Sequence, residues 1–230
     1  MPSCIGLHAF RGLLARRVLA VSAAAVGLSA AAAASELCLH WRTDQGQYIG
    51  GGSYAYDAAR DRIVHFGGTD VTASRFRYSG VTWEYDGKRW ARLDVAGPSL
   101  RQGERLVYDS QRGVTVLVGG GFASVPTDSE TWEWDGISWV RRATAGPLPR
   151  IEPALAYDSD RGVTVLYSGL GRGSGPGYEP LEDTWEWDGQ VWRSCAAVGP
   201  GPRPGPSMLY DAARRETLNA GRYTGAGTGL

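Results

Sequence analysis

The stretch 131–139 reads Thr-Trp-Glu-Trp-Asp-Gly-Ile-Ser-Trp, and close copies of it begin at Thr82 and Thr184. Its Asp-Gly pair lies between two short arms rich in aromatic residues. This is a strong indication of a tight β-hairpin, because glycine adopts positive φ without steric cost. The indole rings on both arms offer large apolar surfaces for packing one sheet on another. The stretch therefore predicts a repeated hairpin whose tryptophans form a framework between sheets. These tryptophans are Trp83, Trp90, Trp132, Trp139, Trp185 and Trp192.

A second motif, Tyr-Asp-x-x-Arg, precedes each hairpin and occurs once more after the last one. Its tyrosines are Tyr56, Tyr108, Tyr157 and Tyr210, at spacings of 52, 49 and 53 residues. The motif lies between short apolar runs, so it predicts a turn in which the aspartate accepts bonds from backbone amides. The β-branched runs 114–118 and 163–167 that follow have the length of buried strands. A period near 50 residues is typical of propeller repeats.

These motifs together resemble kelch repeats, as found in exported bacterial proteins and in the central domain of galactose-oxidase-like proteins. The resemblance covers about Trp41 to Gly221. It implies an all-β, kelch-type β-propeller built from four-stranded antiparallel blades. We place a propeller domain over residues 35–230, with units near 54–103, 106–152 and 155–205 and a partial unit at 208–222. The fold alone implies no activity, because such propellers include both enzymes and binding proteins.

The pattern is incomplete at both ends. Residues 37–42, which include Trp41, resemble the outer strand of an earlier unit, and no Trp-Glu-Trp-Asp-Gly follows Tyr210. We therefore expect three full blades plus partial strands at both ends. In one interpretation the N-terminal strand pairs with the two C-terminal strands and closes a small ring. In the other the chain is an open arc, whose unpaired edges favour self-association.

The first 34 residues form a separate segment. Arg11, Arg16 and Arg17 precede an apolar run, 18–34, that ends in small residues. This order is typical of a secretory signal peptide, and we expect cleavage after Ala34. The run is short and alanine-rich for a membrane span, so we expect no stable membrane insertion after cleavage. The sequence thus predicts an exported protein that is periplasmic, extracellular or located at the cell surface.

The charge balance argues against nucleic acid as a partner. The chain has 24 basic and 24 acidic residues, and removal of residues 1–34 leaves 21 and 24, a net charge of −3. A nucleic-acid binder carries a basic surplus that neutralises phosphates. Export also makes a disulfide between Cys38 and Cys195 conceivable. However, both cysteines would lie on outer strands of different blades, farther apart than a disulfide spans. An intermolecular disulfide stays an alternative.

A copper site of the galactose oxidase type needs two histidines and two tyrosines. The exported chain has only His40 and His65, and the pattern of the repeats does not bring them together. We expect His65 to be a packed strand residue. The sequence shows no nucleophile–base order, phosphate loop or metal-ligand spacing. We therefore expect no catalytic residues, no metal and no cofactor.

One glutamate recurs between the aromatic residues of each hairpin: Glu84, Glu133 and Glu186. The position predicts that each carboxylate points into a contact between blades, where it needs a partner. The arginines that follow each Gly-Pro pair recur in phase with the glutamates and can bind a carboxylate in bidentate geometry. We expect these arginines, Arg101, Arg150 and Arg203, to be the partners. A ring of acid–base carboxylates is the alternative, but a residue present in every unit is normally architectural.

The loops between the second and third strands of each unit differ most in length and sequence. They span 68–81, 120–130 and 169–183, and loops on a rigid scaffold commonly carry function. The candidate binding residues in these loops are Asp70, Arg75, Arg77, Tyr78, Phe122, Asp128, Arg172, Tyr178 and Glu179. The leading hypothesis is a non-enzymatic module that binds a protein or glycan there. The alternative is a fragment or relative of a carbohydrate-active, galactose-oxidase-like enzyme whose catalytic residues are absent here.

Overall fold

The structure of the 230-residue chain is a computed structural model. It describes residues 49–70, 77–122, 125–126, 128–172, 177–195, 199–201 and 205–221. All of them belong to the second of two compact units, Asp44–Leu230. The predicted signal peptide, the N-terminal strand at 37–42, Cys38 and His40 lie outside the described residues.

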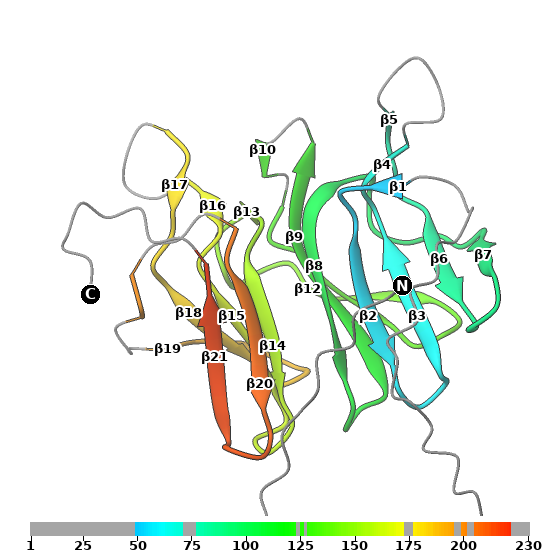
Figure 1. Ribbon diagram of the computed structural model, residues 1–230. Helices are drawn as coiled ribbons and strands as arrows, with labels where there is room; N and C mark the ends of the chain where they lie inside the picture. Colours follow the sequence, from blue (N-terminus) through cyan, green and yellow to red (C-terminus); the bar gives the residue numbers. More distant parts are fainter. Residues whose placement is uncertain are drawn as a thin grey trace, which may run out of the picture. The chain divides into compact units, whose positions relative to one another are not determined.

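Three antiparallel blades follow one another along the chain, as the repeats predict (Figure 1). The first blade contains β2 (Ser53–Asp57), β3 (Arg62–Phe66), β6 (Thr82–Tyr85) and β7 (Trp90–Leu93). The second contains β8 (Gln102–Asp109), β9 (Val114–Phe122), β11 (Thr131–Trp134) and β12 (Trp139–Ala143). The third contains β14 (Ala154–Asp158), β15 (Val163–Tyr167), β18 (Thr184–Trp187) and β19 (Trp192–Cys195). A partial unit follows, formed by β20 (Ser207–Asp211) and β21 (Glu216–Ala220).

Shorter strands extend the blades at one edge. Two small three-stranded sheets have the orders β1-β4-β5 and β13-β16-β17, and one further short strand pairs with the end of β9. These strands are β1 (Ile49–Gly50), β4 (Thr69–Asp70), β5 (Arg77–Tyr78), β10 (Val125–Pro126), β13 (Arg150–Ile151), β16 (Leu170–Gly171) and β17 (Glu179–Pro180). The variable loops predicted from the sequence are therefore partly ordered as hairpins.

Local chemistry explains both turns of each blade. In the Tyr-Asp-x-x-Arg turn of the second blade, Asp109 Oδ1 accepts bonds from the amides of Gln111 and Arg112, each at 3.0 Å. In the Trp-Glu-Trp-Asp-Gly hairpin, Asp135 accepts two amide bonds in the same way, and Gly136 has a φ of +95°. Equivalent bonds form in the other units. Aspartate at these positions satisfies the turn amides, as the sequence predicted.

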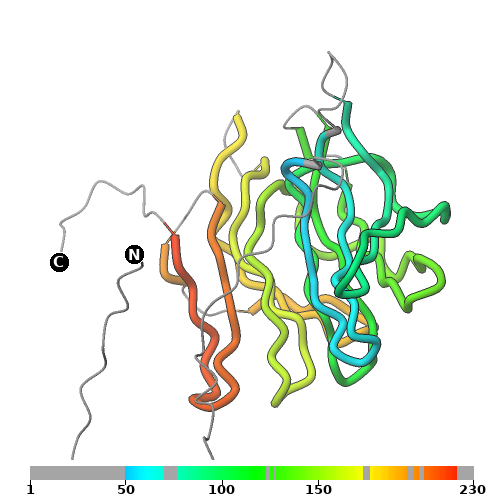
Figure 2. The backbone as a smooth tube through the Cα atoms, turned by 45° about the vertical axis from the view of Figure 1, so that its right-hand side comes forward, coloured from blue at the N-terminus to red at the C-terminus, as the bar shows by residue number. Residues whose placement is uncertain are grey.

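Adjacent blades pack face to face in chain order. The inner strands β2, β8, β14 and β20 lie side by side, which both Figure 1 and Figure 2 show. One hydrophobic cluster joins the first and second blades through Val64, Phe66, Leu117 and Trp134. Another joins the second and third through side chains that include Leu166 and Trp187. The core thus lies between sheets, where burial of large rings contributes most of the hydrophobic stabilisation.

The partner predicted for the repeated glutamates is wrong. Glu84 binds Arg60 at 2.7 Å, and Glu133 binds Arg112 at 2.5 Å. These arginines come from the Tyr-Asp-x-x-Arg turns and not from the positions after Gly-Pro. The reason is strand direction: the third strand of each blade runs toward the edge where these turns lie, so its glutamate is near the turn. Arg101 and Arg150 begin at the opposite edge and bind other carboxylates, as described below.

The predicted location of the glutamates between blades is confirmed for two of them. Trp134 Nε1 of the second blade donates to Glu84 Oε1 at 2.9 Å. Trp187 Nε1 of the third blade donates to Glu133 Oε1 at 3.0 Å. A second indole bond accompanies each of these, from Trp139 to Thr82 and from Trp192 to Thr131. Each full junction is thus fixed by two indole donors meeting one carboxylate and one hydroxyl.

The third blade meets the partial unit without these indole bonds. Among the described residues, no tryptophan donates to Glu186, whose side chain is 27% exposed against 1% for Glu133. Glu186 still binds Arg161, at 2.6 Å. On the partial unit, Leu209 and Leu218 are exposed. The outer half of this junction therefore lacks the covering that the first two junctions have within the described residues.

Cys195 is a free thiol among the described residues. Its pKa is raised by burial and by the neighbouring Glu186, which lowers its thiolate fraction.

In the described part of the chain all regular structure is strand and turn, and no helix there is suited to crossing a membrane.

The buried carboxylate network gives a test of the junctions. We expect Glu133→Gln to lower the free energy of unfolding by roughly 2–3 kcal/mol, because Arg112 keeps only Asp109 as a counter-charge and the Trp187 indole loses its ionised acceptor. Arg112 is itself partly exposed, which keeps the loss below that of a fully buried pair. The matched control is Glu186→Gln, for which we expect a loss under about 1 kcal/mol. Urea denaturation of both variants measures the difference, and equal losses would contradict this account.

Candidate functional site

The variable loops gather at one edge of the described blades. In Figure 1, β5, β10 and β17 from three successive units all project from the upper edge. We define the loop edge as the described residues of 68–80, 99–101, 120–130, 148–150 and 169–183. Several exposed large apolar side chains lie here: Leu100, Phe122, Val125, Leu148 and Tyr178. The edge is therefore ordered at its base and apolar in part of its exposed surface.

Two buried arginines hold the base of the loop edge. Arg101 is fully buried and binds Asp128 through two contacts, at 3.2 and 2.9 Å, and also donates to the carbonyl of Gly119. Arg150 repeats this arrangement with Asp183, at 2.6 and 2.8 Å. Bidentate pairs of this kind fix geometry as well as charge. Each arginine thus connects the start of its blade to the far end of its variable loop.

This arrangement changes the role of Asp128. The sequence suggested a ligand contact, whereas the structure places its carboxylate on Arg101. Asp183 has the same role in the third blade, where Arg150 and the Trp185 indole together hold its pKa below the ordinary value despite burial. Arg101 and Arg150 are buried and hold loop carboxylates instead of the predicted glutamates, and Arg203 lies outside the described residues.

The aromatic residues of the loop edge come together between units. The rings of Tyr78 and Phe122 lie with centroids 4.5 Å apart, although they belong to the first and second units. Phe122 is 51% exposed. In the third unit, the guanidinium of Arg172 lies 5.5 Å from the centre of the Tyr178 ring. The structure therefore brings together two of the predicted residues across a junction and two more within one loop.

The remaining predicted residues are placed as follows. Asp70 and Arg77 are register partners in the β4–β5 hairpin. Arg77 and Glu179 are exposed, and Glu179 pairs across β16–β17 with Gly171. Arg75 lies outside the described residues. The described members of this set come from strands of three successive units, so the loop edge is a surface to which three units contribute.

His65 is a packed residue, as expected. It is buried, its ring centroid lies 4.4 Å from that of Tyr54, and burial lowers its pKa to about 4. Its Nε2 atom has no hydrogen-bond partner among the described residues. Over the same residues, no three His, Cys, Asp or Glu side chains are grouped as metal ligands.

Glu104 is a buried carboxylate that sequence reasoning missed. It lies beneath the loop edge on β8, accepts a bond from the Ser53 amide at 3.2 Å, and is 1% exposed. Burial raises its pKa from 4.5 to about 7, against the opposing effect of Arg101. The first unit has Gly52 at this position, and the two units that follow have Pro153 and Pro206. That break in the repeat was the available sequence signal.

The raised pKa of Glu104 predicts a pH effect on stability. A carboxyl group whose pKa is higher in the folded state favours folding when protonated, and this contribution is lost as pH rises from about 4.5 through 7. We expect Glu104→Gln, which retains the acceptor for Ser53, to remove that loss. At pH 8 the variant should exceed the wild type in stability by roughly 3 kcal/mol. At pH 4.5 the two should be nearly equal.

Urea denaturation at several pH values, analysed as the difference between variant and wild type, measures this effect. Taking the difference cancels the titration of the paired aspartates that both proteins share. A difference that does not change with pH would show that Glu104 is ionised in the folded protein across this range.

One comparison with known proteins supports the fold, and none of the comparisons shows a family. No family model matches the chain, and no curated protein matches it. Among solved structures, that of YjhT, a β-propeller, is similar with a TM-score of 0.57 and 15% sequence identity. The match covers 74% of this chain and 58% of the YjhT chain. At this identity the likeness establishes the propeller fold alone.

Proposed function

We propose that this chain is an exported kelch-type binding module without catalytic activity, which recognises a partner through the loop edge. The observation that carries the proposal is the Tyr78–Phe122 pair, because two units contribute to one exposed aromatic surface. The buried Arg101–Asp128 and Arg150–Asp183 pairs support it, since they fix the loops before any ligand arrives. Preorganised loops bind with a smaller entropic cost.

A protein is the partner that this surface favours over a glycan. Aromatic side chains and arginine are enriched at the centres of protein interfaces, and the loop edge exposes Phe122, Tyr178 and Arg172. A surface to which three units contribute also suits a protein, whose interfaces are broad, better than a small ligand. Recognition of a glycan by the same residues is the alternative outcome of the experiment below.

The experiment is partner capture by the exported chain from its native extracellular or periplasmic fraction, followed by affinity measurement with the purified partner. We expect the double variant Tyr78→Ala and Phe122→Ala to weaken binding at least tenfold, in line with the loss of one interface hot spot. The matched control is Ile137→Ala, because Ile137 is 80% exposed but lies on a β11–β12 turn outside the loop edge.

Unchanged melting temperatures would show that both variants remain folded. Equal binding by the double variant and the wild type would reject the loop edge as the recognition surface. Binding that survives removal of protein from the captured material, but not glycosidase treatment, would assign the edge to a glycan.

A further inference from the structure

The first and last full-length sheets of the described chain each have one uncovered face. In β2 every second side chain is buried, and Tyr54 and Tyr56 on the opposite face are 52% and 55% exposed. In β20 the alternation is reversed, since Leu209 is exposed whereas Met208 and Tyr210 are partly buried. Successive side chains of a strand point to opposite faces of its sheet. The first blade and the partial unit therefore expose opposite faces of the same repeat.

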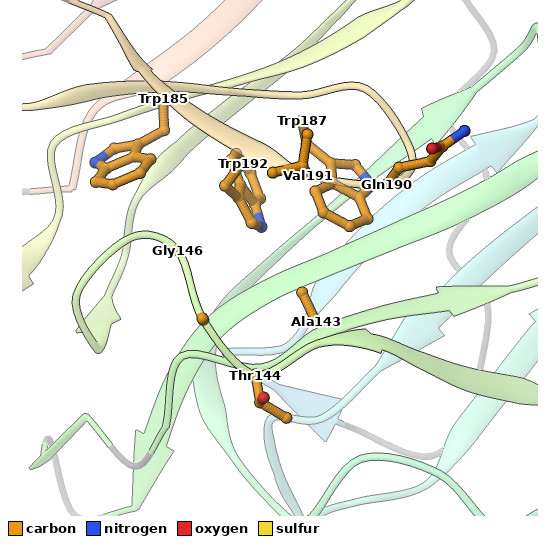
Figure 3. Close-up of a pocket in the computed structure, with 9 residues that line it drawn as sticks. Ala143, Thr144, Gly146, Trp185, Trp187, Gln190, Val191 and Trp192 are labelled. Carbon is orange, nitrogen blue, oxygen red and sulfur yellow. The ribbon is translucent and has the colours of Figure 1, made fainter.

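The junctions within the chain show which faces meet. We call the face that a blade turns toward the preceding blade its front face, and the opposite face its rear face. The front face of the second blade brings four large side chains to the first junction: Leu106, Leu117, Trp134 and Trp139. They pack on the rear face of the first blade, which contributes Ala55, Val64 and Phe66. At the second junction, Trp192 of the third blade lies so close to Gly146 of the second that a Cβ atom there would collide with the indole (Figure 3).

The uncovered face of the first blade is a front face. Its register pair Tyr54–His65 corresponds to the pair Leu106–Leu117 of the second blade. The ring centroid of Trp90, the first residue of the outer strand, lies 6.2 Å from that of Tyr54 and 6.3 Å from that of His65. Aromatic side chains are enriched at the centres of protein interfaces. The first blade thus presents an aromatic front face at positions that are buried in the second blade.

The uncovered face of the partial unit is a rear face. Its register pair Leu209–Leu218 corresponds to the pair Ala55–Val64 of the first blade. Ala55 and Val64 are 8% and 0% exposed, whereas Leu209 and Leu218 are 57% and 45% exposed. An apolar face at positions that a repeat otherwise buries is a contact surface without its partner.

The tyrosines of the Tyr-Asp-x-x-Arg turns indicate the same match. From the second blade on, burial and an aspartate of the preceding turn raise the pKa of each tyrosine: Tyr108 beside Asp57, Tyr157 beside Asp109, and Tyr210 beside Asp158. In the first blade, the Tyr56 hydroxyl instead donates to Asp61 of its own turn at 2.8 Å. Asp211 holds the aspartate position of the last turn and binds Arg214. Within the described residues, Tyr56 and Asp211 are the two ends of this series.

We propose that two copies of this chain associate head to tail, with the front face of each first blade on the rear face of the other copy's partial unit. Tyr54 and Trp90 then cover Leu209 and Leu218, as the front face of the second blade covers the first blade. A two-fold axis makes both contacts at once, so that two unlike faces close into a ring. The ring holds six full blades and two partial units, and propellers of up to eight blades are known.

This contact does not depend on the function proposed for the loop edge. Sedimentation equilibrium of the exported chain tests it first, and we expect a reversible dimer. A chain that stays monomeric up to ~100 μM would overturn the proposal and would leave both faces to other parts of the chain or to solvent. Open assemblies of more than two copies would contradict the closed ring.

One variant of each face tests which surfaces meet. The rear variant combines Leu209→Glu and Leu218→Glu, and the front variant is Tyr54→Glu. Each should weaken the dimer more than tenfold, because a carboxylate would be buried against an apolar face. The matched control is Ile137→Glu, which adds the same charge at an exposed hairpin position outside both faces and should dimerise as the wild type does.

A mixing experiment separates head-to-tail contact from a symmetric one. The rear variant keeps an intact front face and the front variant an intact rear face, so a mixed dimer contains one unaltered junction. We therefore expect an equimolar mixture to associate more strongly than either variant alone. A mixture no stronger than its components, or full dimerisation by one of the two variants, would overturn the head-to-tail arrangement.

A milder variant keeps the test valid if the glutamates disturb folding, which circular dichroism would show. Leu209→Ala with Leu218→Ala removes only exposed apolar groups, and we expect it to weaken the dimer three- to tenfold. Unchanged association of this variant would remove the partial unit from the interface and reject the proposal.

Discussion

The structure depends on one repeated contact, in which an arginine joins a turn to a carboxylate that also receives the indole of the next blade. In the second blade, Arg112 binds both Asp109 and Glu133, and Glu133 accepts the bond from Trp187. In the first blade, Arg60 binds both Asp57 and Glu84, and Glu84 accepts the bond from Trp134. A carboxylate buried as deeply as Glu133 is tolerated because Arg112 and Arg142 balance its charge and both of its oxygens accept hydrogen bonds. The same contact therefore closes each of the first two blades and orients the blade that follows.

This contact also explains why function is left to the edges. Four of the tryptophans are committed to junctions, and their N–H groups are used within the fold: Trp134, Trp139, Trp187 and Trp192. The arginines that follow the Gly-Pro pairs are committed as well, to Asp128 and Asp183. What is free to vary is the loop edge, which these pairs hold in place.

The sequence predicted the blades because their determinants are local. The Asp-Gly hairpins and the Tyr-Asp-x-x-Arg turns each fix a few neighbouring residues, and the period then orders the units. The Glu–Arg pairing was predicted wrongly because two sets of arginines recur in the same phase. A period cannot separate them, whereas strand direction does: Arg60 lies at the edge toward which β6 runs, near Glu84. The pairing of Asp128 was missed for a similar reason, because its partner Arg101 is 27 residues away.

The packing at the second junction could not be predicted from the repeat, because the strand register changes there. The linkers after Trp90 and Trp139 have equal length, so the sequence aligns Leu93 with Arg142. The bulge in β11–β12 displaces that alignment by one residue and presents Ala143 instead. A single-residue shift in register exchanges which side chains face a neighbouring sheet. Repeats that are nearly identical in sequence can thus place side chains of different size at equivalent junctions, while the indole bonds to Thr82 and Thr131 stay the same.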